Sequence, residues 1–208
     1  EIYHGKLEPS QKKKVYDRFT ASEPGDGLML LATNAFGMGV DKPDIRYIAH
    51  AQVPGSIESY YQEIGRAGRD GEASRCLLLY EKSDLGIQQE FIEWMNPSAD
   101  LLELAALEIS NSPNGSLDAD ELREKLTGRN RGDRRAEYCL IGLEKRGIIE
   151  HADTAGRYSF IRTPDEGEIC PKAIEEKRQR DLRRLLDVLE LAQSSDIRSR
   201  ILDYFGLD

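Results

Sequence analysis

The sequence has no long hydrophobic run and only three cysteines among its 208 residues. A membrane-spanning helix needs about 20 mostly apolar residues, and no run approaches that length. We also expect no signal peptide. Cys76, Cys139 and Cys170 lie far apart, in a spacing that fits neither a metal site nor a disulfide framework. These absences predict a cytoplasmic protein with no membrane partner and with reduced, mostly buried thiols.

The chain also lacks an excess of positive charge, since its formal net charge is -9. Coating nucleic acid by bulk attraction is therefore excluded, and any phosphate binding must come from local basic patches. The patch in residues 177–184 is interleaved with acids and is interpreted as a solvated face. A second patch comprises Arg129, Arg131, Arg134 and Arg135. For this patch, the sequence is equally compatible with a solvated face and with a nucleic-acid contact.

Residues 1 to about 95 alternate between helix and strand patterns. The run Gly27–Ala32 is short, apolar and bounded by glycine, which is typical of a buried parallel strand. The alternation predicts an α/β fold in which helices cover a parallel sheet. The expected helices are Ser10–Phe19 and Ile57 to about Arg66, and the other expected strands are Ile45–Ala49 and Arg75–Tyr80.

Residues 56–71 place Gln62, Arg66 and Arg69 at spacings of four and three. On a helix these side chains project from one side, where two guanidinium groups could converge on a phosphate. Two glycines in the segment disfavour a regular helix, so we expect a break that directs Arg69 away from its own domain. For this segment alone, a solvated basic helix end remains the alternative.

A second polar segment follows the strand expected at Gly27–Ala32. In open α/β sheets, ligands gather at the carboxyl ends of strands. Thr33, Asn34 and the loop through Asp41 therefore lie where chemistry is expected. The loop glycines, including Gly39, would let the backbone approach a phosphate closely.

Together, the runs AFGMGVDKPD (residues 35–44) and QEIGRAGRDG (residues 62–71) closely resemble motifs V and VI of the RecQ family of superfamily 2 DNA helicases. Tyr3-His4-Gly5 is a weaker point of resemblance. The resemblance implies that residues 1–95 are a second RecA-like motor lobe, incomplete at its N-terminus. We accordingly expect the chain to be part of a longer polypeptide.

The resemblance also implies roles for single residues in catalysis. Arg69 would be the arginine finger, Arg66 a γ-phosphate or interface contact, and Gln62 a coupling residue near the nucleotide. These three residues are the predicted catalytic set.

Other residues of this lobe are implied to bind nucleotide or DNA. Gly39 and Asp41 would contact the nucleotide or couple the motifs. Thr33 and Asn34 would hold the backbone of the tracked DNA strand.

The sequence contains neither G-x-x-x-x-G-K-[ST] nor a DExH box, the parts that cradle ATP phosphates and hold the metal in such motors. ATP and Mg²⁺ would thus be held mainly by a first RecA-like lobe of the same polypeptide, and this chain alone should not turn over ATP. By resemblance, the whole enzyme would couple ATP hydrolysis to 3′ to 5′ translocation on single-stranded DNA and to unwinding of duplex DNA.

After residue 96 the pattern becomes helical. Three helices followed by a hairpin is the order of a winged helix, which is predicted for residues 97–165. The expected elements are Leu101–Ile109, Leu117–Leu126 capped by Ser116, Arg134–Arg146 capped by Asp133 and ended by Gly147, and strands at 148–151 and 158–161.

The third of these helices would be the one that enters a nucleic-acid groove. Its leading residues Arg131, Arg134 and Arg135 could grip phosphates without reading sequence. A protein-docking or packing role for this region remains an open alternative.

Residues 170–208 form the third predicted segment, which is helical from Pro171. Residues 196–206 resemble the helix that enters the RecQ zinc module, but Asp196 stands where family members generally have the first zinc cysteine. One carboxylate without its partners binds zinc poorly, so no zinc site is predicted. A stripe at helical spacing is interpreted as a core face, comprising Ile174, Leu182, Leu185, Leu186 and Leu189.

Two other functions compete with a DNA helicase. One is a noncatalytic nucleic-acid-binding or regulatory module, in which the winged helix works and the partial lobe is a remnant. The other is an RNA-directed superfamily 2 enzyme. Sequence upstream of Glu1 would distinguish the first, and a comparison of ATPase stimulation by DNA and RNA the second.

Overall fold

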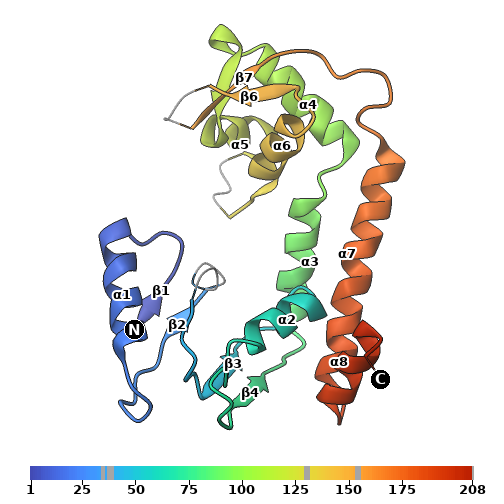
Figure 1. Cartoon of the computed structure of the whole chain (residues 1–208). Helices are drawn as coiled ribbons and strands as arrows, with labels where there is room; N and C mark the ends of the chain where they lie inside the picture. The colour runs from blue at the N-terminus through green and yellow to red at the C-terminus, as the bar shows by residue number, and fades with distance from the viewer. Residues whose placement is uncertain (34–35, 37–39, 129–131, 153–155, 208) are drawn as a thin grey trace. The chain divides into compact units, whose positions relative to one another are not determined.

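The computed structural model describes residues 1–33, 36, 40–128, 132–152 and 156–207 (Figure 1). The chain divides into two compact units, which we call unit 1 (residues 1–84 and 185–208) and unit 2 (residues 85–184). Helix α7 (Pro171–Ala192) contributes residues to both units. The grouping differs from the predicted segments 1–95, 97–165 and 170–208, because residues from 185 onward belong with unit 1.

Unit 1 contains two short parallel sheets. Strand β1 (Ile2–Tyr3) pairs with β2 (Leu31–Ala32), and β3 (Tyr47–His50) pairs with β4 (Arg75–Leu78). The predicted parallel pairing is confirmed for these strands.

The prediction of a buried strand over residues 27–32 was wrong in extent and in burial. Only Leu31 and Ala32 are strand, and the exposed fractions of Met29 and Leu31 are 77% and 62%. An apolar run favours burial, but burial also requires another element to cover it. Within the described chain, no element covers these two side chains.

The helices of unit 1 begin at local signals in the sequence. Ser56 accepts a hydrogen bond from the Ser59 amide at the start of α2, and Asp196 accepts one from the Ser199 amide at the start of α8. The three helices that lie wholly in this unit are α1 (Pro9–Ala21), α2 (Ile57–Ile64) and α8 (Ile197–Phe205).

The core of unit 1 joins α2 to the end of α7 and to α8. The predicted core stripe on α7 was wrong for Leu186, which is 58% exposed, whereas Leu185 is buried. One residue along a helix is a rotation of about 100°, so neighbours in sequence face different environments. The buried cluster consists of Val53, Ile57, Tyr60, Val188, Leu191 and Ile201.

Unit 2 combines helices with a three-stranded antiparallel sheet in the order β5-β7-β6. The sequence predicted the hairpin and three of the helices but missed α3 and β5. The elements are α3 (Asp84–Met95), α4 (Ala99–Ser110), a 3-10 turn η2 (Pro113–Gly115), β5 (Ser116–Asp118), α5 (Ala119–Thr127), α6 (Arg135–Glu144), β6 (Ile149–His151) and β7 (Arg157–Phe160).

The predicted helix cap at Ser116 was wrong, because Ser116 lies in β5 opposite Ser159. Asp118 caps α5 instead, and with Glu121 it forms a reciprocal capping box. At α6, the carboxylate of Asp133 accepts a hydrogen bond from the Arg135 amide at 2.9 Å, although Arg134 occupies the N-cap position. Gly147 follows α6 with a φ of 64°, as its predicted role requires.

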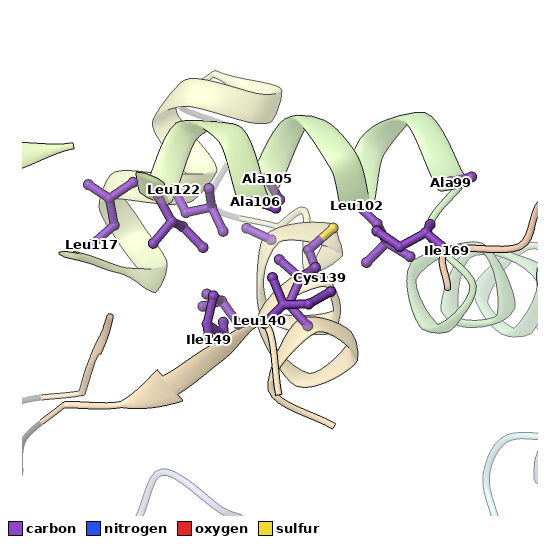
Figure 2. Packing of buried hydrophobic residues seen from close by; sticks show 14 residues of the cluster. Ala99, Leu102, Ala105, Ala106, Leu117, Leu122, Cys139, Leu140, Ile149 and Ile169 are labelled. Atoms are coloured by element: carbon purple, nitrogen blue, oxygen red, sulfur yellow. The ribbon is translucent and has the colours of Figure 1, made fainter. Parts of the chain in front are cut away.

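The core of unit 2 is built on small residues of α4. Ala105 and Ala106 face α5 and α6, where Leu122 and Leu140 pack against them (Figure 2). Cys139 is fully buried in the same cluster, and burial raises the pKa of its thiol to about 12. In the described part of the chain, no helix has the length and apolar character needed to cross a bilayer.

Candidate functional site

Helix α2 ends at Ile64, so the predicted break before Arg69 is confirmed, but it comes earlier than the expected end near Arg66. Gly68 adopts a φ of 63°, and a Cβ at that position would lie 2.8 Å from the Glu72 carbonyl oxygen. A side chain there is excluded by both backbone conformation and space. Of the three polar residues predicted to share a helix face, only Gln62 lies in α2; Arg66 and Arg69 lie in the loop that follows it.

The loop of residues 65–71 is tied to the segment that leads into β3. The Gly68 amide donates to the Ile45 carbonyl at 3.0 Å, and the Asp70 amide donates to the Pro43 carbonyl at 3.3 Å. The Arg46 guanidinium also donates through both terminal nitrogens to the Asp70 carboxylate. This hydrogen bonding lowers the pKa of Asp70.

Arg69 and Asp41 are the predicted site residues that the structure brings into contact. Nη1 of Arg69 lies 3.1 Å from Oδ1 of Asp41, and Nε donates to the Gly65 carbonyl at 3.2 Å. The side chains are 41% and 87% exposed, so the pair lies at the surface. Gln62 is also exposed, and Arg66 is half-buried. The Arg69 guanidinium can thus exchange its carboxylate for another anion without a change in the core.

Thr33 follows β2 directly, at the carboxyl end of the strand. Its amide donates to the Tyr3 carbonyl at 3.1 Å, and its carbonyl accepts from the Phe36 amide at 3.0 Å. The Thr33 side chain is exposed. The predicted site residues Asn34 and Gly39 lie outside the described residues.

The sequence reasoning missed Lys42, which lies next to Asp41 and is buried. Its Nζ donates to the Ser22 carbonyl at 2.5 Å and lies 2.8 Å from Oδ1 of Asp44. The hydrogen bond from Lys42 to the Asp44 carboxylate lowers the pKa of Asp44. A lysine between two aspartates in the DKPD run was the available signal, since a buried lysine requires such partners.

The basic residues Arg134 and Arg135, at the start of α6, are paired with acids. Nε of Arg134 lies 2.9 Å from Oε1 of Glu137, and Arg135 binds the Asp133 carboxylate through both Nε and Nη2. The hydrogen bonding from Arg135 lowers the pKa of Asp133. A phosphate would have to compete with these carboxylates. Arg131 lies outside the described residues.

Among the described residues, no group of three or more His, Cys, Asp or Glu side chains is placed to hold a metal ion. The Asp196 carboxylate, which stands at the position of a zinc cysteine in the resemblance, is bonded to the Ser199 amide at 3.0 Å. It acts in this structure as a helix cap.

Residues 1–71 match the family model described as the helicase conserved C-terminal domain. The domain covers α1, α2, the strand pair β1-β2, β3 and the loop that carries Arg66 and Arg69. This match defines the class to which the first part of the chain belongs.

Three similar proteins narrow the class from helicases in general to the RecQ type. The ATP-dependent DNA helicase RecQ of Bacillus subtilis is 50% identical over 91 residues, which are 44% of this chain and 15% of the relative. The "RecQ-like DNA helicase BLM" of Xenopus laevis is 51% identical over 83 residues, 40% of this chain and 6% of the relative. The "Probable ATP-dependent DNA helicase RecS" of Bacillus subtilis is 30% identical over 206 residues, 99% of this chain and 37% of the relative.

These similarities confirm the resemblance that the two motifs indicated. The chain is a C-terminal region of the type found in RecQ-family helicases of superfamily 2. The chain spans between 6% and 37% of the length of these three relatives.

Proposed function

We propose that this chain is the second motor lobe and following region of an ATP-dependent DNA helicase. The complete enzyme couples ATP hydrolysis to translocation on single-stranded DNA, 3′ to 5′ by family resemblance, and to unwinding of duplex DNA. A first RecA-like lobe of the same polypeptide is the partner of unit 1. The observation that carries the proposal is the surface loop at 65–71, which holds Arg69 beside Asp41 within the matched helicase domain.

ATP and Mg²⁺ are the proposed cofactors, and the residues present fit one part of their site. Arg66 and Arg69 offer the planar donors that suit phosphate oxygens. By the family resemblance, the metal and most of the triphosphate would belong to the other lobe, since the sequence given contains neither G-x-x-x-x-G-K-[ST] nor a DExH box. When bound, Mg²⁺ would supply charge neutralisation on the phosphates, and Arg69 would stabilise the charge that develops on the transferred group.

We further propose that residues 97–165 form a winged helix that contacts DNA. The order α4, β5, α5, α6, β6, β7 and the antiparallel pairing of β5, β7 and β6 support this proposal. Arg134 and Arg135, at the start of α6, are the proposed phosphate contacts, and each would exchange its carboxylate partner for a phosphate.

The direct test is Arg69→Ala in the complete polypeptide. Loss of an arginine finger lowers the rate of phosphoryl transfer by about 10³ to 10⁵, so DNA-stimulated ATPase and unwinding should both disappear. Arg180→Ala, at an exposed position on α7, is the matched control and should retain both activities. Near-normal ATPase in Arg69→Ala would contradict the role proposed for Arg69, whereas no DNA-stimulated ATPase in the parent polypeptide would favour a noncatalytic binding or regulatory module.

A second candidate is an RNA-directed enzyme of the same class. It is favoured by one similarity: a protein of Acanthamoeba polyphaga mimivirus, 45% identical over 108 residues (51% of this chain and 19% of the relative), carries RNA helicase in its name. Measuring ATPase stimulation by matched single-stranded DNA and RNA separates the two candidates, and we expect DNA to be the stronger activator.

A further inference from the structure

The strand β3 ends at a histidine that the roles described above do not use. Nε2 of His50 lies 2.6 Å from Oε2 of Glu63, in the last turn of α2. A carboxylate only accepts hydrogen bonds, so Nε2 carries the proton. Nδ1 is buried and has no hydrogen-bond partner among the described residues, which leaves Glu63 as the polar anchor of the ring.

The His50 ring packs against helix α2. Its side chain is 9% exposed, and its ring centroid lies 5.0 Å from that of Tyr60, which is itself buried. The His50 carbonyl accepts a hydrogen bond from the Leu79 amide at 3.0 Å, just beyond the end of β4. Burial and the contact with Tyr60 limit the positions that the His50 ring can adopt.

Glu63 is the next-to-last residue of α2, which ends at Ile64. The loop of residues 65–71, which carries the two arginines, follows directly. On the far side of that loop, Asp70 is held by Arg46. Residues 64–69 therefore lie between two side-chain interactions with residues 46–50: Glu63 with His50, and Asp70 with Arg46. The interaction between Glu63 and His50 is the one on the helix side of the loop.

We propose that His50 is a positioning residue for Arg66 and Arg69, and that it acts through Glu63. The bond fixes the rotation of the last turn of α2 against β3, and so the direction in which the chain leaves the helix toward the arginines. The inference rests on the proposed function, because the arginines matter for rate only if they reach ATP.

The test uses substitutions in the complete polypeptide. His50→Phe keeps a ring against Tyr60 but removes the donor, and Glu63→Ala removes the acceptor. Glu63→Gln keeps an oxygen that can accept from Nε2. Glu58→Gln, on the same helix, is the control, since its amide oxygen can still accept from the Tyr204 hydroxyl that Glu58 binds at 2.9 Å.

We expect His50→Phe and Glu63→Ala to lower kcat for ATP by about tenfold to a hundredfold with KM for ATP little changed, because small misplacements of a catalytic group have effects of this size. Glu63→Gln should recover most of the rate, and Glu58→Gln should retain it. Hydrogen exchange at the amides of residues 65–70 should become faster in the first two variants only.

A second cycle separates this inference from the proposed function. In an Arg69→Ala background, where the ATPase rate is already lost, His50→Phe should still make hydrogen exchange at the amides of residues 65–70 faster, because it acts on the loop that carries the arginines. If Arg69→Ala lowers the rate while His50→Phe and Glu63→Ala match the parent in both rate and exchange, the inference is overturned and the proposed function stands. If Arg69→Ala itself matches an active parent, the proposed role of Arg69 fails, and the positioning role of His50 fails with it.

Discussion

The guanidinium of Arg69 lies 3.1 Å from the carboxylate of Asp41, which joins two loops separated by 28 residues. Each loop carries one of the two motifs that resemble RecQ helicases. The pair is at the surface, where an ion pair adds little to stability. Its importance therefore lies in where it holds Arg69.

Asp41→Asn and Arg69→Ala should each change the free energy of unfolding by less than about 1 kcal/mol, because exposed ion pairs contribute no more than that. Chemical denaturation of the two variants and the parent measures the effect. A larger loss would mean that reduced ATPase in Arg69→Ala reports unfolding, and the activity test would then lose its meaning.

Asp118→Ala should destabilise the protein by about 1 kcal/mol, because it removes the capping box of α5. Asp118→Asn retains an acceptor for the Glu121 amide and should stay close to the parent. Ser116→Ala should have a smaller effect than Asp118→Ala, since Ser116 does not cap the helix. Equal losses from Ser116→Ala and Asp118→Ala, measured by urea denaturation, would contradict this assignment.

Leu143→Ala should cost about 2 to 5 kcal/mol, because Leu143 is fully buried in the core of unit 2 and its removal leaves a cavity. Leu186→Ala should change stability by no more than about 0.5 kcal/mol, because that side chain is mostly exposed on α7. Thermal or chemical unfolding of the two variants compares the same substitution in two environments. Similar losses at both positions would show that α7 is placed differently about its axis.

Acid should weaken the fold through Glu168. The hydrogen bonds from the Arg162 guanidinium, with one from the Asp165 amide, hold the pKa of Glu168 at about 2, below the ordinary value of 4.5. A depressed pKa in the folded state contributes stability that is fully present above pH 4.5 and is lost as the pH falls toward 2.

Glu168→Gln should therefore flatten the fall in unfolding free energy between about pH 4.5 and 2. Glu166→Gln, at an exposed neighbouring position, is the control and should leave the slope as it is in the parent. Denaturation curves recorded across this pH range measure the slopes. Identical slopes in the parent and Glu168→Gln would show that the pair with Arg162 does not persist in solution.

Local features of the fold followed from the sequence because neighbouring residues determine them. Ser56 marks the start of α2, and the glycines after Ile64 mark its end. Asp118 shows the limit of such reasoning: Ser116 is an equally suitable cap by type, and only its pairing with Ser159 in β7 removes it from that role. The exposure of Leu31 has the same origin, since an apolar residue is buried only when a distant element covers it.

The sequence by itself determined the two motifs, the break before Arg69, the parallel arrangement of strands and the resemblance to RecQ helicases. The tertiary structure decided which side chains meet: Arg69 with Asp41, and His50 with Glu63. It also placed residues 185–208 with unit 1. Spacing along the chain specifies local geometry, whereas these contacts depend on how β3 lies against α2 and its following loop, and that packing is set by residues far apart in sequence.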